Sequence, residues 1–418
     1  MKQKQLIILV VAAIVLAVFT YFVNRSHDDA WRDGGQTGGA TLLPADFDSA
    51  NICQVTLQSA DKSITLEKKD DGWKVKDRYG YPANFAELKE FMYDLTETRI
   101  AQTMTVDETQ RGDLRLVPDQ GAVTVTLADQ NGQALQTLVF GKKIEKESEQ
   151  PQMPGMMGMG GGAVPVGRYL ELADNRVITT NHTFGLVDEP ASFWLDKEFF
   201  KISDLKSATL SENGEPLWSV NRDLKTADFT LLADIPADKE TDSTKLNSLK
   251  SAFSWIRFND VADPAAKPED IGMDKPKVLT ALDFDGFVYA IRLGAQVNGK
   301  QYLSLNVEWK GDLTRIPAAD EKPEDKERLD AEFTRKVKEK QDKAKELNDR
   351  LSPWTYEVGT YALSNVSKTL AELLKDKPKP EPEKSADADA GDKDKPAADV
   401  ETGKPAAEAV AAPAEKKE

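Results

Sequence analysis

The stretch GAVTVTLADQNGQALQTLVFG, residues 121–141, decides the fold that we expect for this chain. From Val123 to Leu127 apolar residues alternate with threonine, which is the pattern of a strand with one buried face. Asn131-Gly132 is a strong signal for a two-residue hairpin turn, since both residue types tolerate positive φ angles. Leu138 and Phe140 then return on a second strand. The stretch therefore predicts an antiparallel β-hairpin.

A second stretch, LTALDFDGFVYAIRLG at residues 279–294, repeats this design, with Asp285-Gly286 in the place of Asn131-Gly132. The neighbouring elements recur in one order: a tryptophan strand, a helix, the hairpin, a Tyr-Leu strand and an aromatic helix. Because the order is kept across all of them, we predict a tandem duplication of one α+β unit rather than a chance recurrence. The matched elements are the strands around Trp73 and Trp218, the helices 82–100 and 244–258, the strands from Tyr169 and Tyr302, and the aromatic helices 192–205 and 352–366.

Apolar spacing also predicts where helices begin and which face they bury. Asn84 is the expected N-cap of the first helix, with Glu87 three residues further on. A charged insertion, residues 319–351, has a narrow apolar stripe that packs either on its own domain or on a partner. That stripe consists of Leu329, Phe333, Val337, Ala344, Leu347 and Leu351.

A membrane anchor is expected at the N-terminus, from Leu6 to Val23, where the chain has no charge and no proline. A helix of this length spans about 27 Å, close to one hydrocarbon core. The weak lysine and arginine bias and the terminal amine favour a cytoplasmic N-terminus and an extracytoplasmic body. We therefore predict a single-pass protein of the inner (plasma) membrane. Two alternatives are a cleaved signal peptide, although no small-x-small site follows Val23, and a buried core helix.

The expected fold class is thus α+β: an N-terminal transmembrane helix, two tandem α+β repeats with antiparallel sheets, and a disordered C-terminal tail. The predicted parts are an anchor at 1–24, a flexible linker at 25–49, a first repeat at 50–200 with a Met/Gly-rich insertion at 142–167, a second repeat at 201–374 with the charged helical insertion at 319–351, and a disordered acidic tail at 375–418.

Composition excludes several classes of function. The 418-residue chain has a net charge of −16, which argues against nucleic-acid binding because such binders need a basic face. A single cysteine, Cys53, rules out an intrachain disulfide framework. The only histidines are His27 and His182, too few for a histidine-rich metal site. No nucleophile elbow, phosphate-binding loop or zinc-protease motif is present. We predict no catalytic residue, no cofactor and no enzymatic activity.

One cluster of soft donors stands out in the first insertion. Met153, Met156, Met157 and Met159 lie in a glycine-rich segment, and thioethers suit Cu(I). These methionines are weak metal candidates only, because no histidine or cysteine accompanies them. The alternative is an adaptable hydrophobic contact.

Several motifs resemble one known family. The chain has IxxVxL at 52–57, DGWKV at 71–75, PAN at 82–84, and LVFGK and IRLG at 138–142 and 291–294. With the N-terminal apolar helix, these motifs resemble domain-of-unknown-function family 4340 over roughly residues 50–310. The resemblance implies membrane-anchored extracytoplasmic proteins associated with ABC-type export permeases, including gliding-motility systems. It supplies no catalytic residues.

The expected function is therefore that of a non-enzymatic, membrane-anchored accessory protein, an auxiliary or scaffolding component of an ABC-type transport system. Its expected partners are the membrane, through the anchor, and a membrane protein complex such as an ABC permease, bound through sheet edges and the groove between the repeats. The alternatives are an extracytoplasmic carboxylate-based hydrolase or glycan-modifying enzyme, and a Cu(I)-binding protein that uses the methionine-rich segment.

Overall fold

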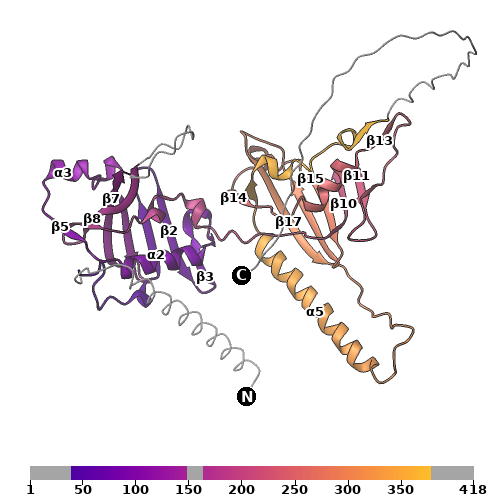
Figure 1. The fold of residues 1–418 in the computed structure, drawn as a ribbon, viewed down its shortest axis with the longest axis horizontal. Coiled ribbons are helices and arrows are strands. Elements are labelled where there is room, and N and C mark those ends of the chain that lie inside the picture. The colour runs from indigo at the N-terminus through magenta and orange to yellow at the C-terminus, as the bar shows by residue number, and fades with distance from the viewer. Residues whose placement is uncertain (1–38, 148–162, 378–418) are drawn as a thin grey trace, which may run out of the picture. The chain divides into compact units, whose positions relative to one another are not determined.

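The structure, a computed structural model, describes residues 39–147 and 163–377, which form mainly β-sheet (Figure 1). The strands form two antiparallel sheets, of nine and eight strands, and a small two-stranded sheet. The prediction of an α+β fold was wrong, because most of the expected helices are absent.

The first large sheet has the strand order β4-β3-β2-β1-β6-β7-β8-β9-β5. A helix, α2 (Phe85–Glu97), packs its apolar face into the core of this sheet, and a short helix, α3 (Glu108–Asp113), follows β5. The strands are β1 (Gln54–Gln58), β2 (Ser63–Lys69), β3 (Gly72–Val75), β4 (Tyr81–Pro82), β5 (Gln102–Met104), β6 (Val123–Ala128), β7 (Ala134–Glu147), β8 (Ala163–Leu172) and β9 (Val177–Thr180).

The second large sheet has the order β12-β11-β10-β15-β16-β17-β18-β14. Its long helix, α5 (Lys326–Leu351), contacts β17, and a short helix, α4 (Ser243–Asn247), precedes β14. The strands are β10 (Leu205–Glu212), β11 (Glu215–Asn221), β12 (Thr230–Leu231), β14 (Phe258–Val261), β15 (Lys277–Asp283), β16 (Phe287–Leu293), β17 (Gln301–Trp309) and β18 (Tyr356–Val358), while β13 (Lys239–Thr241) and β19 (Leu374–Asp376) form the small sheet.

The two large sheets share one strand order. When β4 is left out, β3-β2-β1-β6-β7-β8-β9-β5 corresponds strand for strand to β12-β11-β10-β15-β16-β17-β18-β14. Both predicted hairpins are confirmed, as β6 pairs with β7 and β15 pairs with β16. Their turns are capped alike: the carboxylates of Asp129 and Asp283 each accept hydrogen bonds from the backbone N–H groups two and four residues further on.

The glycines that end the two hairpins lie at close backbone approaches. The N–H after Gly141 donates to the carbonyl of Leu114, and the N–H after Gly294 donates to the carbonyl of Gly272, both at 2.8 Å. A Cβ on Gly141 would lie 2.5 Å from the Leu114 oxygen, and a Cβ on Gly294 would lie 2.8 Å from the sulfur of Met273. The absence of a side chain lets each strand pass its lead-in segment.

Of the helices expected in the two repeats, one is confirmed, one is shortened and two are absent. The first is confirmed as α2, whose N-cap is Asn84, with its side chain accepting from the N–H groups of Ala86 and Glu87. The predicted helix at 244–258 ends at Asn247 and continues as a 3-10 turn, Ser248–Ser251. The aromatic segments 192–205 and 352–366 form 3-10 turns, loops and β18 instead of α-helices, because their aromatic rings pack against strand residues.

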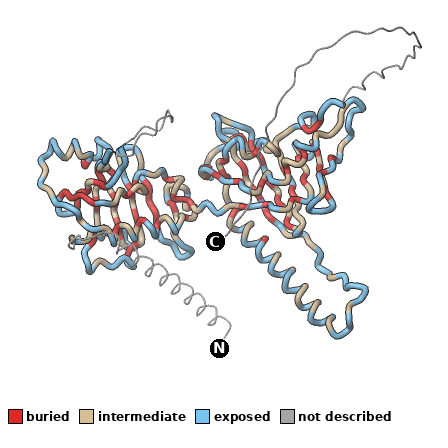
Figure 2. Tube along the Cα trace, viewed as in Figure 1, coloured by how far each residue is buried: buried red, intermediate tan, exposed pale blue. Residues whose placement is uncertain are grey.

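The charged insertion forms α5, as predicted. Figure 2 shows buried residues along the strands of both large sheets, whereas α5 is exposed over most of its length. Only Ala344 and Leu351 of this helix are buried, and Leu347 packs partly against the core. Asn348 accepts a hydrogen bond from the N–H of Val307 on β17 at 3.0 Å. The C-terminal half of α5 therefore packs on its own sheet.

The membrane prediction is not supported. Among the helices of residues 39–147 and 163–377, none is long and apolar enough to cross a membrane, which contradicts the expected single-pass inner-membrane location. The segment on which that prediction rested, Leu6 to Val23, lies outside the described residues.

Candidate binding groove

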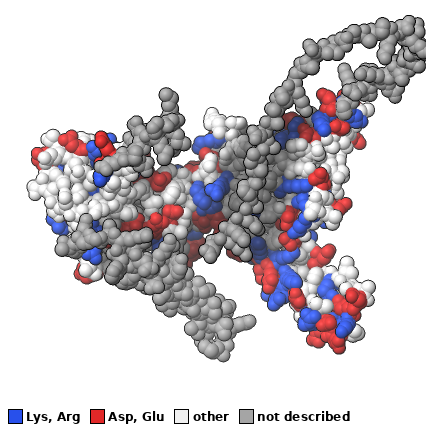
Figure 3. All heavy atoms as spheres, in the orientation of Figure 1, with Lys and Arg blue, Asp and Glu red and all other residues white. Residues whose placement is uncertain are grey.

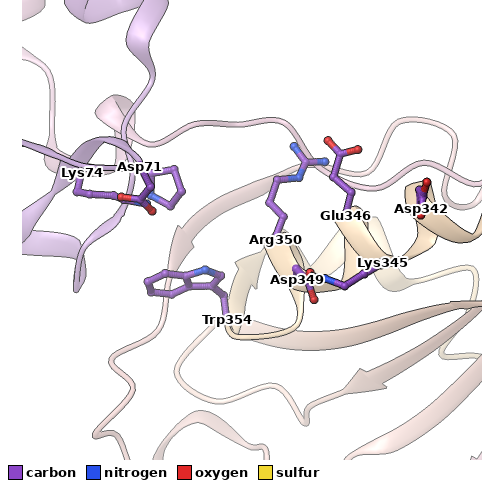
Figure 4. A pocket seen from close by; sticks show the side chains of 9 residues that line it. Asp71, Lys74, Asp342, Lys345, Glu346, Asp349, Arg350 and Trp354 are labelled. Carbon is purple, nitrogen blue, oxygen red and sulfur yellow. Dashed lines mark hydrogen bonds and ion pairs between the residues drawn. The ribbon is translucent and has the colours of Figure 1, made fainter. Parts of the chain in front are cut away.

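A cavity of about 620 Å³ lies where the β2–β4 edge of the first sheet meets the end of α5 (Figure 4). We call this cavity the junction groove. Figure 4 shows Trp354 between the β2–β3 turn and the last turns of α5. The groove is lined by Asp71, Lys74, Pro82, Asp342, Lys345, Glu346, Asp349, Arg350 and Trp354.

Local structure explains how these side chains converge. Gly72 adopts a φ of 121° and allows the tight turn that presents Asp71. On α5, positions 342, 345, 346 and 349 are spaced by three and four residues, so they share one helix face. The helix ends at Leu351, and the N–H of Trp354 bonds back to the Leu351 carbonyl at 3.3 Å. That turn places the indole beside the last turn of α5 (Figure 4).

Some charged side chains of the groove have ion-pair partners and others have none. Each cation that lines it already has an ion-pair partner, whereas Asp342 and Glu346 have none among the described residues. The hydrogen bond from Lys74 is the main cause that holds the pKa of Asp71 below its usual value. Figure 3 shows acidic and basic side chains intermixed over α5, without a patch of one sign. The ion pairs are Lys74–Asp71 at 2.8 Å, Lys345–Asp349, and Arg350–Glu198 at 2.9 Å.

Trp354 has an unused donor. Its ring meets Tyr81 edge-on, with the centroids 4.9 Å apart, which fixes the indole plane. The indole N–H groups of Trp218 and Trp309 donate to backbone carbonyls at 2.8 Å, but that of Trp354 has no partner among the described residues. It is also accessible, unlike the buried and unpaired N–H of Trp194.

Trp354 also lines a smaller cavity of about 270 Å³. We call it the second cavity, and Asp263 is the one charged residue in its wall. The remaining lining residues are Ala262, Pro264, Ala266, Pro268, Ile271, Met273, Pro353 and Thr355.

Contacts between the two sheets hold the groove together. Arg78, after β3, donates through Nε to both carboxylate oxygens of Asp260 on β14, at 2.7 and 3.0 Å. Lys197 donates to the carbonyl of Asn259 at 2.6 Å and lies 4.4 Å from the ring centroid of Phe258. Partial burial lowers the pKa of Lys197 to about 8. This lysine lines none of the three cavities described in this section, so we assign it to the junction rather than to catalysis.

A third cavity, of about 440 Å³, contains two carboxyl groups with opposite pKa shifts. Burial raises the pKa of Asp283, and a hydrogen bond from Lys340 lowers the pKa of Asp285. Such a split is typical of acid–base pairs in hydrolases. However, Asp283 caps its hairpin turn just as Asp129 does in the first sheet, so the turn itself explains its position.

His182 lies in the loop that follows β9. Its Nδ1 accepts a hydrogen bond from the N–H of Phe184 at 3.2 Å, and its Nε2 lies 3.4 Å from the carboxylate of Asp94. Burial raises the pKa of Asp94, and His182 opposes that shift. No serine or cysteine is bonded to His182 among the described residues, so this pair lacks the nucleophile of a catalytic triad.

The methionine cluster, Met153, Met156, Met157 and Met159, lies outside the described residues. Within residues 39–147 and 163–377, no group of three or more histidine, cysteine, aspartate or glutamate side chains could hold a metal ion.

Sequence reasoning expected binding between the repeats but did not identify the groove residues. It assigned Trp354 to a helix. The helical spacing of Asp342, Glu346 and Asp349, opposite the apolar stripe of α5, was the one signal that could have suggested an exposed acidic face.

No family model, curated protein or solved structure matches the chain. The resemblance to domain-of-unknown-function family 4340 therefore stays a hypothesis.

Proposed function

We propose that this protein is a non-enzymatic accessory or scaffolding protein that binds its partner in the junction groove. The observation that carries the proposal is the groove itself, a cavity of about 620 Å³ built jointly by the first sheet, α5 and Trp354. Ligand sites in proteins are concave, contain an aromatic surface and a few unpaired polar groups, and occupy roughly 300–1,000 Å³. Trp354, Asp342 and Glu346 supply those features.

The chemistry of the groove supports binding over turnover. Its carboxylates are either ion-paired or on the exposed face of a helix, and the one with a shifted pKa, Asp71, is shifted downward. A general acid that works near neutral pH needs a raised pKa. The resemblance described above adds the proposed partner: a component of an ABC-type transport system.

Site-specific photo-crosslinking in cells at native expression tests this function. A photoreactive residue replaces Asp342 in the groove or, as a control, the exposed Arg328 on the same helix, about 21 Å away along its axis. We expect an ABC-type transport component to be captured from position 342 and not from position 328. Capture of no protein other than this chain would contradict a role in binding. Capture of an unrelated protein would contradict the transport assignment.

A further inference from the structure

His182 makes a different contact with each of its two ring nitrogens. Its Nδ1 accepts a hydrogen bond from the N–H of Phe184 at 3.2 Å, and its Nε2 lies 3.4 Å from the carboxylate of Asp94 on α2. A neutral imidazole has one donor nitrogen and one acceptor nitrogen. Since Nδ1 is the acceptor, the proton of neutral His182 is on Nε2, where it faces Asp94. The hydrogen-bond partners therefore assign one tautomer to this side chain.

Protonation of His182 is compatible with only one of these two contacts. Both nitrogens of a charged imidazole are donors, so Nδ1–H would point at the N–H of Phe184 and that hydrogen bond would be lost. The contact with Asp94 would instead become an ion pair. A histidine side chain usually changes its charge between pH 5 and 8, and His182 is 41% exposed, so protons from solvent reach it.

Phe184 has a backbone conformation that residues other than glycine seldom adopt. Its φ of 48° and ψ of 51° lie in the left-handed region, and we call residues 182–184 the histidine turn. The ring of Phe184 is buried, with its centroid 5.2 Å from that of Phe140 and 4.4 Å from that of His182. The 3-10 turn Gly185–Asp188 begins directly after it. The bond from the Phe184 N–H to Nδ1 therefore helps to hold the chain in a strained conformation.

Cations of the first sheet hold the chain that follows the histidine turn. Arg168 donates to the carbonyls of two successive residues of this chain, at 3.3 and 3.2 Å, and Lys62 donates to a third carbonyl at 3.2 Å. Asp188 has ion pairs with Arg168 and Lys143, both at 2.8 Å. These contacts do not involve the imidazole. Loss of the bond to Nδ1 would therefore release the histidine turn and leave the rest of the segment attached to the sheet.

Carboxylates on α2 favour the charged state of His182. Asp94 is in direct contact with the imidazole, and Glu90 lies one helical turn before it. Burial raises the pKa of Asp94, and His182 and Glu90 act on that pKa in opposite directions, His182 lowering it. Since opposite charges stabilise each other, Asp94 in turn favours a protonated imidazole. The positive charge of Arg168, which bonds to the carbonyls beside the ring, acts against it but is paired with a carboxylate.

We propose that His182 is a pH-sensitive switch of the histidine turn. In its neutral state the imidazole accepts the Phe184 N–H and holds the turn in the left-handed conformation. In its charged state it loses that bond, pairs with Asp94 and releases the turn. None of these residues lines the junction groove, so the switch does not depend on the proposed function.

Solution NMR of the full chain tests the switch, because His27 and His182 are its only histidines. At about pH 8.5, above the usual range of histidine, nitrogen-15 spectra of the ring should show His182 as the Nε2–H tautomer. As the ring becomes protonated, protection of the Phe184 amide from hydrogen exchange should fall about threefold to tenfold, after correction for the intrinsic effect of pH on exchange. An Nδ1–H tautomer, or constant protection of this amide while the ring titrates, would overturn the proposal.

Variants separate the role of the imidazole from other effects of pH. His182→Asn is the matched control, because an asparagine side chain accepts the N–H two residues further on and does not titrate, so protection of the Phe184 amide should stay constant. Asp94→Asn removes the partner of the charged state and should lower the pH midpoint of the ring by a few tenths of a unit. Glu215→Gln, which removes one negative charge from the second sheet, should leave the midpoint unchanged. A wild-type pH dependence in His182→Asn, or an unchanged midpoint in Asp94→Asn, would show that the switch is not His182 with Asp94.

Discussion

Replacement of Arg168 by methionine should destabilise the first sheet, because this arginine is a buried cation with five hydrogen bonds. Its side chain is 4% exposed and sits on β8. Nε donates to the carbonyl of Gly141 at 2.9 Å, and the two Nη groups donate to both carboxylate oxygens of Asp188 at 3.0 and 2.8 Å. Nη1 also reaches the carbonyls of Thr183 and Phe184, at 3.3 and 3.2 Å. The guanidinium thus ties the segment 183–188 to the sheet.

The expected loss follows from what stays behind in the variant. Removal of one partner of a buried ion pair costs about 3–5 kcal/mol, because the other charge and its acceptors lose their donors. Asp188 is 38% exposed and keeps an ion pair with Lys143 at 2.8 Å, so the low end of that range applies. A loss of about 3 kcal/mol lowers the Tm by roughly 6–12 °C for a folding unit of about 150–250 residues.

Thermal unfolding followed by circular dichroism measures the effect. The matched control is Arg176→Met, because Arg176 lies on the adjacent turn, is 53% exposed, and pairs with Asp174 at 2.6 Å. Exposed pairs contribute about 0–1 kcal/mol, so its Tm should move by no more than a few degrees. If the Tm of the Arg168 variant lay within 2 °C of the Tm of the control variant, the buried hydrogen bonds of Arg168 would not stabilise the fold by the expected amount.

Two other perturbations have expected outcomes. Burial raises the pKa of Asp188, but hydrogen bonds from Arg168 and Lys143 outweigh burial, so the pKa of this carboxyl is lowered. The ionised Asp188 therefore stabilises the fold at pH values above its unfolded pKa of about 3.9. This stabilisation is lost as pH falls through the lower pKa of the folded state. The difference in urea midpoint between wild type and Asp188→Asn should therefore shrink below about pH 4, and a constant difference would contradict the shift. Gly141→Ala places a Cβ against the Leu114 carbonyl and should cost about 1–3 kcal/mol, whereas Gly185→Ala meets no atom within 4 Å and should be nearly neutral. Equal midpoints for the two glycine variants would contradict the close approach.

The features that sequence predicted correctly are those encoded by neighbouring residues. Alternation around an Asn-Gly or Asp-Gly pair determines a hairpin locally, and both hairpins form. The Asn84 cap is also a contact between close neighbours in the chain. The charged helix α5 was identifiable because its composition excludes a strand with a buried face.

The segment 244–258 shows why the fold class was misjudged. Leu246, Leu249, Phe253 and Ile256 are all buried, so the apolar spacing did identify the core positions. The backbone reaches that arrangement through a five-residue helix and 3-10 turns, which bury residues at a similar spacing. The periodicity of the apolar residues therefore identified the residues that face the core, but it did not determine the backbone conformation.

The groove was beyond sequence reasoning for a different reason. Its residues come from positions 71–82 and 342–354, and no local pattern specifies that these segments meet. Their meeting depends on long-range contacts, including the bond between Arg78 and Asp260 and the packing of Tyr81 on Trp354.

The comparison of the two sheets bears on the position of the proposed binding site. Their strand orders correspond, and their hairpin turns carry the same aspartate cap. Yet the pKa of Asp129 is lowered by its backbone hydrogen bonds, whereas burial raises that of Asp283, because α5 and the segment before it cover the second turn. The same helix supplies five of the nine residues that line the junction groove. Since α5 has no counterpart among the described residues of the first sheet, the binding surface that we propose lies where the second sheet departs from the strand order that the two sheets share.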